Sequence, residues 1–84
     1  MQFLLHRVFQ KRFEKLPLKI REQFFERAEI FYEDTYAEIL QNHSVDNVYP
    51  NCRSINITGD VRALYKVQGN IAIFVNIGTH SELY

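Results

Sequence analysis

The feature that most constrains this chain is a change of hydrophobic period near Cys52. Before that residue, large apolar side chains recur every three or four positions, as they do on one face of an α-helix. After it, polar and β-branched residues alternate, as they do in strands. Both patterns fit within 84 residues, so the sequence predicts one α+β domain spanning residues 1–84.

The N-terminal half predicts a short strand and two helices. Residues 3–5 are apolar without interruption and predict the strand. A short basic helix follows, and Pro17 suits the first turn of a second helix that continues to about Asp34. The apolar stripe of this second helix, which needs a sheet to cover, consists of Leu16, Ile20, Phe24, Ala28 and Phe31.

The C-terminal half predicts three antiparallel strands. Residues 53–57 and 61–67 alternate, with a tight turn at Gly59 and Asp60 between them. A second hairpin closes at residues 68–70, and the apolar run 71–77 is typical of a central strand covered on both faces. Residues 35–51 have no clean period and predict connecting structure. The expected order is β-α-α-β-β-β, with two N-terminal helices packed on one side of a small antiparallel sheet.

Composition excludes several classes of protein. A chain with 46% hydrophobic and 14% aromatic residues is neither disordered nor fibrous. The single cysteine, Cys52, cannot form an intramolecular disulfide, and no Cys/His cluster has the spacing of a zinc site. The apolar run at the N-terminus stops at His6, too early for a signal peptide or a membrane span. We therefore expect a cytoplasmic protein with no membrane contact.

The distribution of charge matters more than its sum. The formal net charge is zero, which argues against a nucleic-acid binder. However, residues 1–21 carry six Lys/Arg against one acidic residue, whereas residues 22–46 carry one basic residue against seven acidic ones. The acidic segment is typical of a solvated helix face. The basic segment remains available for RNA.

Two stretches of the sequence carry a resemblance to a known family. Arg53–Lys66, which reads Arg-Ser-Ile-Asn-Ile-Thr-Gly-Asp-Val-Arg-Ala-Leu-Tyr-Lys, and Ile77–Tyr84, which reads Ile-Gly-Thr-His-Ser-Glu-Leu-Tyr, closely resemble YafQ-like toxins of the RelE/ParE superfamily. Residues 9–17 and 40–43 resemble the first helix of that family and the segment carrying its first active-site histidine. The resemblance implies a RelE-like fold with a curved sheet and a ribosome-dependent endoribonuclease, or mRNA interferase.

The same resemblance implies a reaction and its partners. Toxins of this kind enter the ribosomal A site and cut mRNA, where the ribose 2′-hydroxyl attacks the adjacent phosphate and the 5′-oxygen leaves. The resemblance implies no metal and no organic cofactor. It also implies a type II toxin-antitoxin system, in which a cognate antitoxin protein silences the toxin and which can serve plasmid stabilisation.

Four residues match the catalytic positions of the family. His43 and His80 can accept or donate a proton near neutral pH. Asp60 can orient a histidine, and Tyr84 can stack on a base or place its hydroxyl near the phosphate. Each also has a plain structural explanation: a solvated loop histidine for His43, turn residues for Asp60 and His80, and a core-capping aromatic for Tyr84.

Cations for the phosphate come from the same half of the chain. Arg62 resembles the arginine with which RelE-type members hold the phosphate, and Arg53 and Lys66 are further candidates for substrate binding. Exposed strand cations are often merely solvated edge residues. The sequence also departs from the YafQ pattern at three positions, where histidine, tryptophan and arginine are replaced by Asn56, Val61 and Asn76.

Three alternatives to the nuclease remain open at this stage. One is a catalytically degenerate domain that only binds its antitoxin, which the neutral charge and the three departures favour. Another is a ParE-like inhibitor of DNA gyrase, a group that shares the fold without the acid-base residues. The last is a metal site using His6, His43 and His80, although their spacing matches no ligand pattern.

Overall fold

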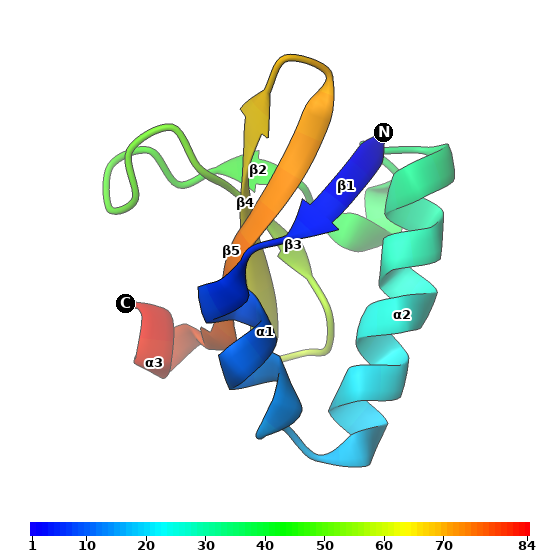
Figure 1. Ribbon diagram of the computed structural model, residues 1–84, viewed down its shortest axis with the longest axis vertical. Helices are drawn as coiled ribbons and strands as arrows, with labels where there is room; N and C mark the ends of the chain where they lie inside the picture. Colours follow the sequence, from blue (N-terminus) through cyan, green and yellow to red (C-terminus); the bar gives the residue numbers. More distant parts are fainter.

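Five strands form one sheet in the computed structural model, which describes residues 1–84 (Figure 1). The spatial order is β1-β5-β4-β3-β2. The strands are β1 (Gln2–Leu5), β2 (His43–Ser44), β3 (Arg53–Asn56), β4 (Val61–Gln68) and β5 (Ile71–Thr79). Strands β2 to β5 pair antiparallel, as expected, whereas β1 pairs in parallel with β5. The sheet is therefore mixed: β1 and β2 form its opposite edges, and the helices between them carry the chain from one edge to the other.

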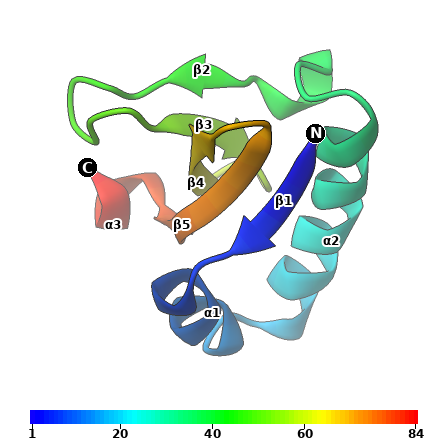
Figure 2. The ribbon, with the colours of Figure 1, turned by 45° about the horizontal axis from the view of Figure 1, so that its top comes forward.

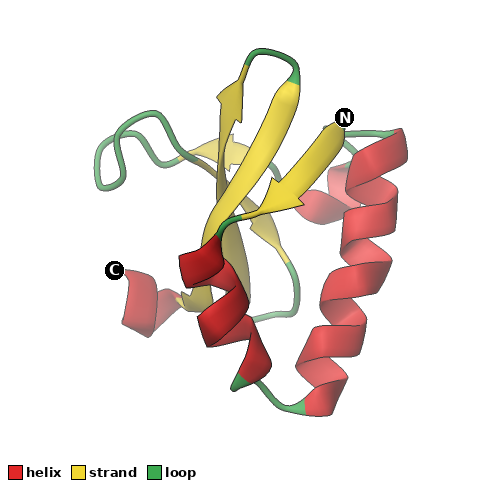
Figure 3. Ribbon diagram, in the orientation of Figure 1, coloured by secondary structure: helices red, strands yellow, loops and turns green.

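The two predicted N-terminal helices are confirmed. Helices α1 (Arg7–Glu14) and α2 (Leu18–Glu33) cover one face of the sheet (Figures 2 and 3). The side chain of His6 caps α1 by accepting the Val8 N–H at 3.1 Å. Pro17 precedes α2 directly, one position earlier than expected. None of the helices is both long and apolar enough to cross a membrane.

Three short elements were missed by the sequence analysis. They are the 3-10 helix η1 (Glu38–Leu40), the two-residue strand β2, and the C-terminal helix α3 (His80–Leu83). Elements of two to four residues have too few positions to show a period. Gly78 lies within β5, which continues to Thr79 before α3 begins. Glycine makes room there: an added Cβ would lie 3.1 Å from Glu82 Oε1.

An aromatic cluster forms the core between the helices and the sheet. Phe74 on β5 is fully buried at its centre. Its ring contacts five others, with centroid distances of 5.3 to 5.8 Å, from Phe3, Phe9, Phe24, Phe31 and Tyr65. Ala28 completes the helix contribution. The predicted stripe of α2 is thus confirmed, with Leu16 and Ile20 half-buried at its end.

The other face of the sheet is covered only in part. The loop 45–52 and helix α3 pack there around Leu64 on β4. Both segments lie on the opposite side of the molecule from α2 (Figures 1 and 2). Ile73 and Val75 on this face of β5 remain half-buried, so the expectation that both faces of this strand are fully covered is wrong. Cys52 is buried in the same small cluster.

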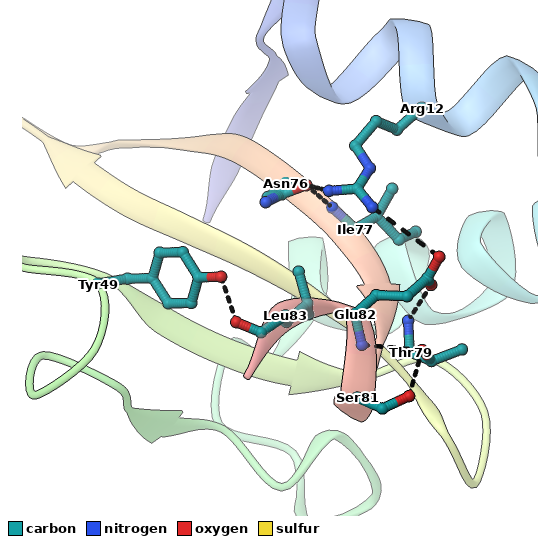
Figure 4. Close-up of polar contacts among 8 residues, drawn as sticks. All are labelled: Arg12, Tyr49, Asn76, Ile77, Thr79, Ser81, Glu82 and Leu83. Carbon is teal, nitrogen blue, oxygen red and sulfur yellow. Dashed lines mark hydrogen bonds and ion pairs between the residues drawn. The ribbon is translucent and has the colours of Figure 1, made fainter.

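Helix α3 is fixed at both ends by polar contacts (Figure 4). At its start, Glu82 accepts the Thr79 N–H at 2.7 Å, and Thr79 Oγ1 accepts the Glu82 N–H at 3.2 Å. Arg12 of α1 approaches Glu82 at 4.0 Å and donates to Asn76 Oδ1 at 2.9 Å. At its end, the Tyr49 hydroxyl donates to the Leu83 carbonyl. Although α3 is very short, it is held at a defined place.

Replacing Phe74 by alanine should remove a large share of the stability of the fold. Truncating a buried phenylalanine costs about 3–5 kcal/mol, and a domain of this size has about 4–13 kcal/mol in total. The matched control is Phe25→Ala, at a phenylalanine that is 58% exposed on α2. Urea unfolding followed by circular dichroism measures both, and equal losses of unfolding free energy would contradict the central place of Phe74.

The capping contact of Glu82 should depend on pH. The backbone N–H of Thr79, then its hydroxyl, hold the pKa of Glu82 below its ordinary value of 4.5. Because this pKa is lowered in the fold, the contact stabilises the protein above pH 4.5 and is lost as pH falls through the lower folded value. A carbon NMR titration of Glu82 should give a midpoint below 4.5, and a midpoint at or above it would refute the cap. In Glu82→Gln, this titration disappears.

Candidate functional site

Four of the seven predicted site residues line one pocket on the partly covered face of the sheet. His43 of β2, Arg62 of β4 and His80 and Tyr84 of the C-terminal segment line a cavity of about 280 Å³. The remaining lining residues are Ser44, Val45, Asn47, Val48 and Ser54. Residues far apart in the sequence thus converge on one pocket.

Two further hollows differ in their lining. One of about 350 Å³ lies beside α1 and pairs Arg12 and Lys15 with Glu82. The other, of about 430 Å³, contains His6 and Lys66 at the opposite end of β4. Both are larger than the pocket with the two histidines. Neither brings two histidines together beside an arginine, so size alone does not identify the site.

His43 is held in one tautomer by its surroundings. Its Nδ1 lies 2.8 Å from the carbonyl oxygen of Gln41, which can only accept a hydrogen bond. Nδ1 therefore carries the proton, and the neutral ring keeps its lone pair on Nε2. The preceding residue, Asn42, fixes the strand by donating to the Thr35 carbonyl at 2.9 Å and to the Tyr65 hydroxyl at 2.7 Å.

His80 and Tyr84 face each other across one turn of α3. The backbone N–H of Tyr84 donates to the His80 carbonyl at 2.9 Å, and their ring centroids are 4.8 Å apart. Tyr49 meets the Tyr84 ring edge-on at 5.9 Å. Tyr84 is 44% exposed, so one part of its ring remains open to a stacking partner.

Two polar side chains of the pocket act on the phenol of Tyr84. Burial raises the pKa of this phenol, while the Ser54 hydroxyl, next in effect, lowers it. Arg62 lowers the same pKa further. All three residues line the same pocket.

Arg62 and Asp60 hold the turn beside the pocket. The Arg62 guanidinium donates to the carbonyls of Thr58 and Gly59, each at 3.2 Å. Asp60 does not line the pocket, but its carbonyl accepts the backbone N–H of His80 at 3.1 Å. In this structure Asp60 therefore positions His80 through its main chain, and its carboxylate has no hydrogen-bond partner.

Arg53 and Lys66 do not reach the pocket. The Nε of Arg53 donates to Asn42 Oδ1 at 2.8 Å, and its guanidinium lies over the Tyr36 ring at 5.5 Å. Lys66 is exposed four residues beyond Arg62 on β4, about 13 Å along an extended strand. The structure thus separates these two predicted substrate-binding residues from Arg62.

The three departures from the YafQ pattern have different local outcomes. Val61 is 7% exposed in the main core, so it offers no stacking surface. Asn76 accepts a hydrogen bond from Arg12 at 2.9 Å. Asn56 donates to Gln41 Oε1 at 2.7 Å, and its own Oδ1 is buried without a partner. None of the three adds a titrating group to the pocket.

The chemistry of the pocket favours an anion. Its lining includes one arginine and two histidines and no aspartate or glutamate. A local cluster of this kind attracts phosphate even though the net charge of the chain is zero. No group of three or more His, Cys, Asp or Glu side chains lies close enough to hold a metal ion. Proton transfer and charge stabilisation are what these residues can provide.

Two residues of the site were not singled out from the sequence. Ser54 lines the pocket with its hydroxyl fully buried, and Tyr49 anchors α3 through the Leu83 carbonyl. The alternation of residues 53–57 already put Ser54 on the face opposite to Arg53. Tyr49 gave no usable signal, because its loop has no period.

Comparison with known proteins gives matches in structure alone. No protein-family model matches the chain, and no curated protein matches it in sequence. The YafQ structure from E. coli strain BL21(DE3) superposes with a TM-score of 0.78 at 17% identity, covering 99% of this chain and 97% of that one. A YoeB/ParE toxin from Agrobacterium tumefaciens gives 0.77 at 14% identity, with coverages of 95% and 99%.

A third match is part of a complex. The intact E. coli RelBE toxin-antitoxin complex gives a TM-score of 0.71 at 20% identity, covering 93% of this chain and 94% of that one. At such identities the likeness concerns the fold, and it extends over nearly the whole of each chain. The chain therefore has the fold of the RelE/ParE toxin superfamily, and the resemblance to its YafQ-like members is confirmed in three dimensions.

Proposed function

We propose that this protein is the toxin of a type II toxin-antitoxin system and a ribosome-dependent endoribonuclease that cuts mRNA in the A site. The observation that carries the proposal is the pocket in which His43, Arg62, His80 and Tyr84 meet without an acidic neighbour. Its two histidines are a pair that can move protons at neutral pH. The toxin fold of the chain supports the same conclusion.

The hydrogen bond of His43 suggests which histidine is the base. With Nδ1–H directed at the Gln41 carbonyl, Nε2 is free to accept a proton. His80 has no hydrogen bond to its ring and stands at the start of α3, beside the Tyr84 ring. We therefore assign the general base to His43 and the general acid to His80.

The reaction then needs no further reagent. His43 takes the proton of the ribose 2′-hydroxyl, and the 2′-oxygen forms a bond to the adjacent phosphorus. The bond from phosphorus to the 5′-oxygen breaks, and His80 gives its proton to that leaving oxygen. Arg62 offsets the charge that develops on the phosphate. The products are a 2′,3′-cyclic phosphate and a free 5′-hydroxyl.

A cognate antitoxin is the expected protein partner. The RelBE and DinJ-YafQ structures that match this chain are toxin-antitoxin complexes. For this protein, binding such an antitoxin is one part of the proposed function, and cutting mRNA is the other. A catalytically degenerate toxin would bind the antitoxin without cutting, so the cleavage assay below decides between a nuclease and a degenerate toxin.

The His80→Ala protein should lose mRNA cleavage by about 100-fold or more, the usual contribution of a general acid. Primer extension on an mRNA in a reconstituted translation reaction measures the cuts, with a ribosome-free sample beside it. The matched control is His6→Asn, since His6 lies outside the pocket and asparagine also caps helices. This control should cut as the wild type does.

Two results would count against the nuclease. If folded wild-type protein makes no cuts, the antitoxin-binding alternative replaces it, and a gyrase supercoiling assay tests the remaining one. If His80→Ala cuts normally, the acid lies elsewhere. The pH-rate profile separates the two roles: its acidic limb should vanish in His43→Ala, and its alkaline limb in His80→Ala.

Arg62 and Lys66 should differ sharply when each is replaced by alanine. Arg62→Ala removes the cation of the pocket and should lower cleavage about 10-fold to 100-fold. Lys66→Ala removes a cation of the same strand that lines a different hollow, and it should change cleavage less than about 2-fold. The same primer-extension assay compares them, and equal losses would mean that the phosphate lies nearer the far end of β4.

A further inference from the structure

Ser54 has an unusual environment at the floor of the pocket. It is 0% exposed, and its hydroxyl oxygen has no hydrogen-bond partner in the protein. Burying a hydroxyl without a partner is unfavourable, because its hydrogen bonds to water are lost and not replaced. Alanine would fill nearly the same space without this cost. The unpaired hydroxyl therefore indicates a partner that the resting site does not yet provide.

The neighbours of Ser54 restrict what that partner can be. On β3 it pairs in register with His43 on one side and with Leu64 on the other. His43 already uses its Nδ1 on the Gln41 carbonyl, and Leu64 has no polar group. Among the other polar groups that line the pocket, Arg62 donates to the carbonyls of Thr58 and Gly59. The Tyr84 hydroxyl differs, because burial raises its pKa and the Ser54 hydroxyl opposes that rise, although the two hydroxyls form no full hydrogen bond.

Two other rings already contact the ring of Tyr84. The His80 ring lies tilted against it at 4.8 Å, and Tyr49 meets it edge-on at 5.9 Å. A ring held at its sides can still slide and turn, so its hydroxyl needs a separate contact. Ser54 is the group in the right place to supply one.

We propose that Ser54 is a positioning residue for Tyr84: its hydroxyl, unpaired at rest, donates to the Tyr84 oxygen when negative charge develops on that oxygen, and so holds the phenol over the reacting phosphate. The role in cleavage rests on the proposed function, whereas the pairing itself is a property of the protein alone. Tyr84 then acts through its hydroxyl group and not merely as a stacking ring.

Titration of Tyr84 in the free protein tests the pairing. Ser54→Ala should raise the Tyr84 pKa above that of the wild type, because the serine hydroxyl favours the phenolate. The signal comes from tyrosine labelled with carbon-13 at Cζ and is assigned with Tyr84→Phe. The matched control is Ser44→Ala, a serine lining the same pocket, which should leave this pKa unchanged. An unchanged pKa in Ser54→Ala would overturn the pairing.

Thermal unfolding separates positioning from a structural role. Because the Ser54 oxygen has no partner in the resting protein, Ser54→Ala should unfold at the same temperature as the wild type or a higher one. A clear decrease would show that Ser54 supports the fold and not Tyr84.

A double-mutant comparison tests the consequence for cleavage. Ser54→Ala and Tyr84→Phe should each lower mRNA cutting about 10-fold, and the double variant should be no worse than Tyr84→Phe, as for groups that act as a unit. Losses that multiply would overturn the proposal. If the wild type makes no cuts at all, the nuclease falls, while the titration still decides whether Ser54 and Tyr84 pair.

Discussion

The packing of aromatic rings around Phe74 is the contact on which the other elements depend. Strand β5 carries this ring between β1 and β4, and both N-terminal helices contribute phenylalanines that pack on it. A chain of 84 residues buries a small core, so a single central side chain accounts for a large share of its stability. The same strand then leaves the sheet and continues directly into α3, so core and pocket share one piece of backbone.

The pocket is assembled by main-chain contacts more than by side-chain pairs. The Asp60 carbonyl fixes the first residue of α3, and pairing of β2 with β3 brings His43 beside Ser54. Tyr49 fixes the end of α3. None of these contacts uses the side chain of Asn56, Val61 or Asn76, the three positions that depart from the YafQ pattern. Local charge in the pocket, and not the zero net charge, determines what it can bind.

Periodicity predicted the element order, including the two hairpins and the stripe of α2. The pocket residues His43, Arg62, His80 and Tyr84 were named only through the resemblance to YafQ-like toxins, and the structure brings these four together. The parallel pairing of β1 was not predictable, since nothing in four residues records which edge they join. Arg53 lies outside the pocket because it points to the face of β3 opposite that of its neighbour Ser54. Lys66 lies outside it because it is four residues beyond Arg62 on the same strand. Ser54 became visible only when its hydroxyl proved buried and unpaired.

The central claim is that this pocket cuts RNA by attack of a ribose 2′-hydroxyl. The most direct measurement compares two ribosome-bound mRNAs that differ in one atom, one all-ribose and one with a single 2′-deoxynucleotide at the position that is cut. The account predicts that the wild-type protein cuts the first mRNA, leaving a 2′,3′-cyclic phosphate, and leaves the second intact at that position. Equal cutting of both would contradict it, because the attacking oxygen would then come from elsewhere.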